Sequence, residues 1–81
     1  MLIKNSKKLK RVDMQIVTIL FQLLHENGPL RKTPLMEKAN LSYSRLILYL
    51  ELLMTLDLIH ITENTVSLTE SGLVFMHNYL K

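Results

Sequence analysis

Cysteine and tryptophan are absent from this 81-residue sequence, and only two of its residues are glycine. Without cysteine the chain can form no disulfide framework, no thiol nucleophile and no cysteine-ligated zinc site. Two separate glycines, Gly28 and Gly72, cannot build a glycine-rich phosphate-binding loop. A small domain without disulfides is typical of the reducing interior of the cell, so we expect a cytoplasmic protein.

A long uninterrupted hydrophobic run is also missing. The most apolar stretch, residues 46–61, contains Glu51 and Asp57, whereas a membrane-spanning helix needs about 18 or more consecutive apolar residues. The basic N-terminus is not followed by the apolar segment and cleavage site of a secretory leader. We therefore expect no membrane segment.

The sequence has little that points to catalysis or metal binding. The three histidines, His25, His60 and His77, lack the short spacing that a zinc site shows. The seven acidic residues are dispersed, and no serine stands in a nucleophile motif. These patterns predict a protein that is not an enzyme and that holds no metal and no cofactor.

The positive charge is concentrated at the start of the chain. The formal net charge is +3, from ten basic and seven acidic residues, and five of the basic residues lie within residues 1–11: Lys4, Lys7, Lys8, Lys10 and Arg11. A basic arm ahead of a folded domain suits a polyanion such as the phosphate backbone of nucleic acid. The alternative is a solubilising tail. We divide the chain into a basic arm, residues 1–11, and one domain, residues 12–81.

Hydrophobic periodicity and turn residues predict a mainly α domain with a small β-hairpin, in the order helix, link, helix, helix, strand, strand, helix. The expected elements are helices at residues 12–26, 34–39 and 43–56, strands at 58–63 and 65–68, and a last helix from Thr69 to the C-terminus. Thr33, Ser42 and Thr69 are expected as N-caps, and Asn40 as a left-handed C-cap. Residues 30–32 are expected to be a short extended link.

The first helix is apolar on two sides, and 48% of all residues are hydrophobic, which is much for a solitary small domain. A homodimer would cover the surplus. We expect the interface on the first and last helices, at Met14, Val17, Phe21, Leu73, Met76 and Leu80.

Several short segments between residues 33 and 72 resemble one family. They are Ala39-Asn40-Leu41-Ser42-Tyr43, Tyr49-Leu50, Leu53, Leu58-Ile59 and Leu68-Thr69-Glu70-Ser71-Gly72. They resemble the archaeal winged helix-turn-helix proteins related to small chromatin-associated DNA-binding dimers and to the multiple-antibiotic-resistance-type regulators. The resemblance implies a nucleoid-associated, double-stranded DNA-binding protein, either a transcriptional regulator or a chromatin component. It also implies that the helix at 43–56 enters the major groove and that the hairpin touches the backbone.

Polar and basic residues near the start of that helix fit such an interface, because recognition helices read bases with their N-terminal residues. On this helix the candidates are Ser42, Tyr43, Ser44, Arg45 and Tyr49. Around the preceding helix and on the wing they are Arg31, Lys32, Thr33, Lys38 and Asn64. On the arm they are Lys7, Lys8, Lys10 and Arg11.

Two features depart from a DNA-binding surface. The outward positions of the helix at 43–56 include Ile47, Leu48 and Leu52 beside Glu51, and the wing at 63–65 has no lysine or arginine. The alternative interpretation is a protein-interaction or dimerisation module that docks a partner protein through Ile47, Leu48 and Leu52.

Overall fold

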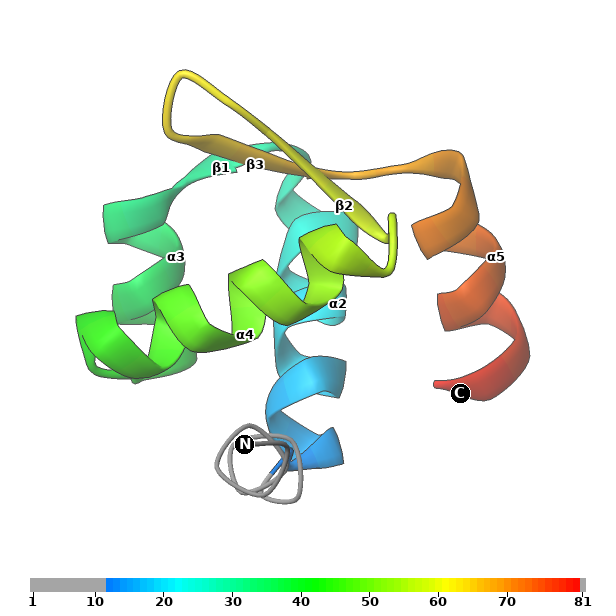
Figure 1. Cartoon of the computed structure of the whole chain (residues 1–81), viewed down its shortest axis with the longest axis horizontal. Coiled ribbons are helices and arrows are strands. Elements are labelled where there is room, and N and C mark those ends of the chain that lie inside the picture. Colours follow the sequence, from blue (N-terminus) through cyan, green and yellow to red (C-terminus); the bar gives the residue numbers. More distant parts are fainter. Residues whose placement is uncertain (1–11, 81) are drawn as a thin grey trace, which may run out of the picture.

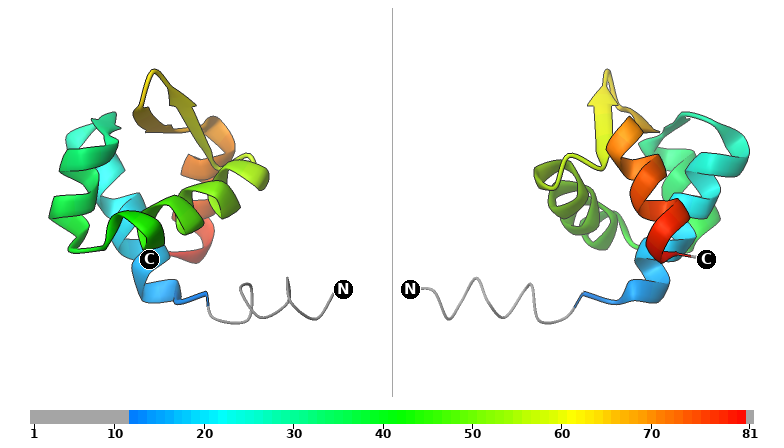
Figure 2. Two further views of the ribbon diagram at one scale, coloured as in Figure 1. Left: turned by 60° about the vertical axis from the view of Figure 1, so that its left-hand side comes forward. Right: turned by 90° about the vertical axis from the view of Figure 1, so that its right-hand side faces the viewer.

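The computed structural model describes residues 12–80, in which short helices alternate with short strands (Figure 1). The elements are α2 (Met14–Asn27), β1 (Leu30–Arg31), α3 (Lys32–Ala39), α4 (Tyr43–Thr55), β2 (Ile59–Thr62), β3 (Thr65–Leu68) and α5 (Glu70–Tyr79). This order confirms the predicted winged helix-turn-helix architecture, mainly α with a small β-hairpin. The hairpin of β2 and β3 projects beyond the helices, with α3 and α5 at opposite ends of the molecule (Figures 1 and 2).

The sheet has one strand more than the sequence predicts. Leu30 pairs with Val66 and Arg31 with Thr65, so that β1 adds to β3 and the strand order is β1-β3-β2. The segment expected to be only a link is therefore tied to the hairpin. A two-residue strand has no period of its own in the sequence, and it forms only because β3 supplies the partner.

The start of α3 differs from the prediction for the same reason. We expected Thr33 as the N-cap, but the helix begins at Lys32 with Arg31 as its N-cap residue, and no side chain caps it. The Lys32 amide donates to the Asn64 carbonyl across 3.1 Å, which turns the chain into the helix directly after β1. Pro34 then lies in the first turn, where its missing N–H has no helical partner to lose.

The other predicted caps are confirmed. The Ser42 hydroxyl accepts from the Arg45 amide (3.3 Å), and the Thr69 hydroxyl accepts from the Gly72 amide (2.9 Å). Asn40 ends α3 in the left-handed region, with φ 58° and ψ 46°. Asp13 is the N-cap of α2, and its carboxylate accepts from the Gln15 amide at 2.8 Å. These short polar side chains set the helix ends locally, independently of the tertiary packing.

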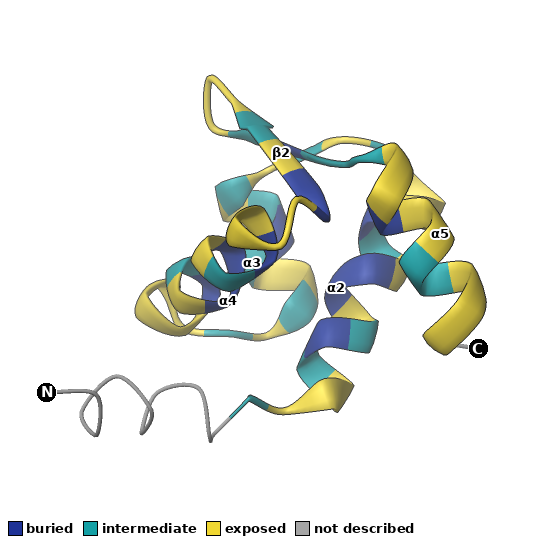
Figure 3. Ribbon diagram, turned by 45° about the vertical axis from the view of Figure 1, so that its right-hand side comes forward, coloured by how far each residue is buried: buried dark blue, intermediate teal, exposed yellow. Residues whose placement is uncertain are grey.

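The core lies between α2, α4 and the sheet. Figure 3 shows the buried residues of these elements in dark blue. On α4 the face formed by Leu46, Leu50 and Leu53 is at most 2% exposed. On α2 the expectation for Val17 and Phe21 is wrong. They are 3% and 0% exposed within one chain, and a second copy cannot reach them. With Leu20 and Leu24 they form a single buried face at helical spacing, so the two apolar stripes merge into one.

Gly72 joins α5 to the base of the hairpin. A Cβ at this position would lie well inside van der Waals distance of the Leu58 carbonyl oxygen and 3.1 Å from its carbon. Glycine at this position therefore allows α5 to lie directly against the Leu58 carbonyl. None of the helices within residues 12–80 is long and apolar enough to cross a membrane.

Candidate nucleic-acid interface

A surface depression forms where the start of α3, the start of α4 and the tip of the hairpin meet. Its lining comes from the three elements and consists of Arg31, Lys32, Thr33, Pro34, Tyr43 and Asn64. All but Pro34 are residues that the sequence singled out for DNA contact. The fold thus brings together side chains that are up to 33 positions apart in the chain (Asn64 and Arg31), and we call this depression the junction.

Backbone pairing fixes the geometry of the junction. The hydrogen bond from the Lys32 amide to the Asn64 carbonyl and the β1–β3 pairing hold the hairpin tip against the start of α3. The tip itself is a two-residue turn, in which Glu63 and Asn64 have φ values of 51° and 64°. Two consecutive residues with positive φ are the signature of a type I′ turn, which matches the twist of a tight hairpin. The tip is therefore held in a defined position relative to α3.

The first turn of α4 lies beside α3 (Figure 2) and exposes four of the predicted residues: Ser42, Tyr43, Ser44 and Arg45. Tyr43 is 57% exposed and reaches into the junction. The Ser42 cap leaves the remaining amides of this turn at the positive end of the helix dipole, which favours an anion such as phosphate. A hydroxyl, a phenol and a guanidinium here can all donate to phosphate oxygens or base edges.

Every lysine and arginine of residues 12–80 lies on β1, α3 or α4, the elements around the junction. Arg31 and Lys32 line the junction, Lys38 lies in the last turn of α3, and Arg45 lies in the first turn of α4. Within the described part of the chain none of the four makes an ion pair. Since no acidic partner of the domain occupies them, all four can bind phosphate.

Residues 12–80 together are nevertheless acidic. Residues 12–80 hold these four basic residues and all seven acidic ones, a formal charge of −3, whereas residues 1–11 and Lys81 hold the other six basic residues. The predicted contacts at Lys7, Lys8, Lys10 and Arg11 lie outside the described residues. Positive charge for a polyanion therefore comes from the helix-turn-helix half of the domain and from the terminal segments.

The structure contradicts the prediction that Tyr49 contacts DNA. We expected it among the DNA contacts, but it is 3% exposed within the core, and its hydroxyl oxygen accepts a 2.8 Å hydrogen bond from the Asp13 amide. It shares the buried face of α4 with Leu46, Leu50 and Leu53. Its position relative to those leucines indicates burial in the sequence, and its polar end misled the prediction.

The sequence reasoning missed the hydroxyl groups of the wing. It noted only the lack of lysine and arginine at residues 63–65. Thr62 and Thr65 are paired directly beside the turn, and His60 pairs with Ser67 two residue pairs further from the tip. Strand alternation puts all four on the face opposite Ile59, Ile61 and Val66, and it could have revealed them. Neutral hydroxyl groups can contact phosphate oxygens without adding charge, but here the Thr62 hydroxyl is hydrogen-bonded to the His60 ring (2.6 Å) and the Ser67 hydroxyl donates to the His60 carbonyl (3.5 Å).

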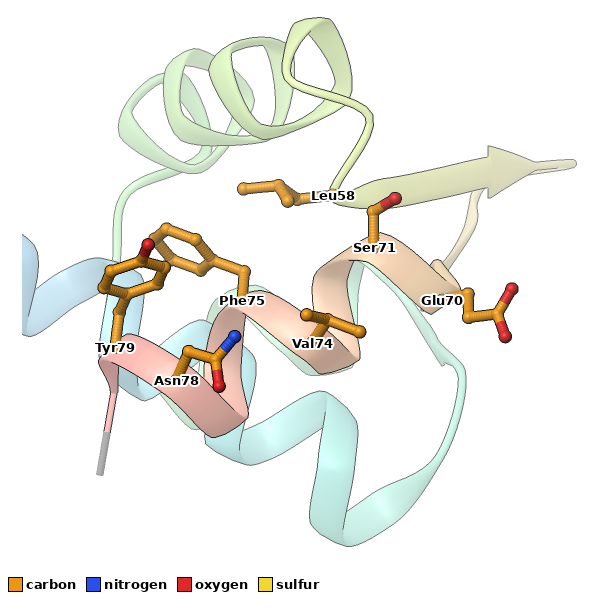
Figure 4. A pocket seen from close by; sticks show the side chains of 7 residues that line it. All are labelled: Leu58, Glu70, Ser71, Val74, Phe75, Asn78 and Tyr79. Carbon is orange, nitrogen blue, oxygen red and sulfur yellow. The ribbon is translucent and has the colours of Figure 1, made fainter.

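A second depression lies along α5, as Figure 4 shows, lined by Leu58, Glu70, Ser71, Val74, Phe75, Asn78 and Tyr79. Its polar side chains point in different directions and include no histidine or second carboxylate beside Ser71. It therefore has no arrangement of nucleophile and base. Within residues 12–80, no three histidine or acidic side chains come together as metal ligands.

Comparison with known proteins agrees with the fold. The model of the family described as winged helix-turn-helix matches residues 10–81, almost the whole chain. The chain belongs to the winged helix-turn-helix family. No curated protein matches it. Domains of this family in general bind DNA or regulate its use, and the fold is typically non-enzymatic. The match is to the family in general, so the archaeal and multiple-antibiotic-resistance-type likeness stays a prediction.

Proposed function

We propose that this winged helix-turn-helix protein binds double-stranded DNA, with α4 in the major groove and with the start of α3 and the wing against the flanking backbone. The observation that carries the proposal is the junction, where Arg31, Lys32, Tyr43 and the wing turn meet. A winged helix needs these three elements on one side of the molecule to follow a duplex. The absence of ion pairs on the four basic side chains within residues 12–80 supports the same surface.

The charge distribution predicts the affinity for DNA and its dependence on salt. Residues 12–80, with a formal charge of −3 and four basic side chains that make no ion pair, should be oriented on DNA by those four side chains, while the basic terminal segments supply the long-range attraction. Each phosphate contact adds about 0.9 to the slope of log affinity against log salt concentration. We therefore expect modest affinity that falls steeply with salt, and a large share of it from Lys7, Lys8, Lys10 and Arg11.

The test of the junction is fluorescence anisotropy with a random-sequence duplex, titrated with salt. Arg31→Ala and Arg45→Ala should each weaken binding and lower the salt slope by about 0.9. Gln22→Glu is the matched control, because it changes the net charge by the same −1 at an exposed position of α2. If both arginine variants bind like the control, the proposed interface is wrong.

The basic arm is tested separately. Replacing Lys7, Lys8 and Lys10 by glutamine should weaken binding about equally for all duplex sequences and lower the salt slope by up to about 2.7, three contacts at 0.9 each. A loss confined to one sequence would contradict a purely electrostatic role.

We further propose a homodimer formed by α2 and α5. Of the ten residues of α5 only Gly72 is buried, while Leu73 is 42% and Met14 of α2 is 51% exposed. Met76 and Leu80, also expected in the interface, are partly buried against the core and keep some exposed surface. Leu73→Glu should convert a dimer into a monomer in sedimentation. Leu56→Glu is the control, because Leu56 is a 55% exposed leucine outside α2 and α5. A wild-type monomer at micromolar concentration and above would refute the dimer.

In the cell, a protein with these properties would act on transcription or on the organisation of chromatin in the nucleoid. Two copies bound to one duplex would read two half-sites. We expect the protein to need no cofactor for this role.

A further inference from the structure

The outward face of α4 carries one continuous stripe. Opposite the buried residues Leu46, Tyr49, Leu50 and Leu53, the exposed residues follow at intervals of four, three and four positions. They are Ser44, Leu48, Glu51 and Thr55. The spacing is that of one helix face, so these side chains meet whatever α4 lies against.

The middle of this stripe is unsuited to phosphate. Leu48 is 37% exposed and apolar, and Glu51 is exposed and acidic, so neither can bind the DNA backbone. The Thr55 hydroxyl donates to the Glu51 carbonyl at 2.8 Å and is occupied within the helix. Leu48 and Glu51 therefore need partners that are not phosphates.

The floor of the major groove offers one partner of each kind. The thymine C5-methyl is the apolar group exposed there, and the cytosine N4 amino group is the donor that a carboxylate accepts from. Leu48 and Glu51 are three residues apart, about 4.5 Å along the helix axis, against about 3.4 Å between base pairs. The two side chains can thus reach bases one or two steps apart.

We infer that Leu48 and Glu51 are the sequence-reading residues of this protein, and that its preferred site has a thymine, contacted by Leu48, within two base pairs of a cytosine, contacted by Glu51. This rests on the proposed function, in which α4 enters the major groove. Arg31, Lys32 and Arg45 orient the helix on the backbone, whereas the stripe selects the sequence.

The experiment starts by selecting bound duplexes from a randomised pool with the full-length protein. The best sequence is then compared with the same duplex in which deoxyuridine replaces thymidine, which removes only the methyl groups. We expect about a fourfold loss of affinity for each methyl group that Leu48 covers. Leu48→Ala should bind both duplexes equally. Met54→Ala is the matched control, since Met54 is a 45% exposed apolar residue of α4 that lies outside the stripe, and it should keep the wild-type preference.

Glu51 is tested by repeating the selection with Glu51→Gln, which should lose the preference for cytosine beside the thymine. Circular dichroism verifies that each variant is folded.

The outcomes distinguish a failure of sequence reading by Leu48 and Glu51 from a failure of DNA binding itself. If wild-type protein binds duplex DNA but enriches no sequence, or binds the uridine duplex equally well, the inference is overturned and the DNA-binding function stands. If no duplex binds at low salt, the proposed function itself fails. If Leu48→Ala keeps the thymine preference, Leu48 is not a reader. If Leu48→Ala leaves DNA binding unchanged and abolishes capture of a protein partner, the stripe is a protein-docking surface and the inference is wrong.

Discussion

Replacing Gly72 by alanine should detach α5 from the base of the hairpin. The new Cβ would overlap the Leu58 carbonyl, which is held in place because its oxygen accepts from the Thr69 amide at 3.1 Å. Two hydrogen bonds of Thr69 also hold the start of α5 in place. Its hydroxyl donates to the Asp57 carbonyl at 2.7 Å and accepts from the Gly72 amide at 2.9 Å. Since the position of a Cβ is fixed by its own backbone and the Leu58 carbonyl is itself backbone, no side-chain rotation relieves the clash.

The magnitude follows from these contacts. Forcing extra atoms into a packed site costs about 1–3 kcal/mol, and losing one hydrogen bond of the Thr69 group costs about 1 kcal/mol more. We therefore expect Gly72→Ala to lower the free energy of unfolding by about 2–4 kcal/mol. A domain of this length has about 4–12 kcal/mol in total, so the variant would lose a large share of its stability.

The assay is urea unfolding followed by circular dichroism, with the midpoint and the slope fitted for each variant. Ser71→Ala is the control, because Ser71 is the exposed neighbour of Gly72 in the first turn of α5 and should change the stability by less than about 0.5 kcal/mol. If Gly72→Ala unfolds at the same urea concentration as Ser71→Ala, the close contact with Leu58 does not limit the packing of α5, and the reasoning is refuted.

Two further positions give simple tests. Tyr49→Phe should lower the free energy of unfolding by about 1 kcal/mol, because the Asp13 amide loses its acceptor, and should leave duplex affinity unchanged; weaker binding by a fully stable variant would return Tyr49 to the DNA interface. Glu63→Lys should strengthen duplex binding and raise the salt slope by about 0.9 in anisotropy titrations, and an unchanged slope would mean that the wing tip does not touch DNA. Glu63→Asn should raise the stability in thermal unfolding by about 1 kcal/mol, because asparagine tolerates the φ of 51° better, and an unchanged or lower melting temperature would contradict the strain at this turn.

Much of the fold could be predicted because its boundaries are local. Ser42 and Thr69 cap their helices through hydrogen bonds within three residues, and Asn40 ends α3 by its own left-handed backbone. The buried face of α4 follows from leucine spacing alone. The exposure of Tyr43 could be predicted in the same way, because it lies in the first turn of the helix, away from the leucines of the buried face; its contact with DNA stays a prediction.

The sequence by itself determined the order of the elements and the ends of most helices, because these depend on residues close together in the sequence. The basic, cysteine-free character of the chain follows from composition alone. Only the tertiary structure decided that Leu30 and Arg31 form a strand, that Val17 and Phe21 are buried, and that Arg31, Lys32, Tyr43 and Asn64 share one depression. Each of these depends on a partner more than thirty residues away or on the direction of a helix within the core, and local spacing contains neither.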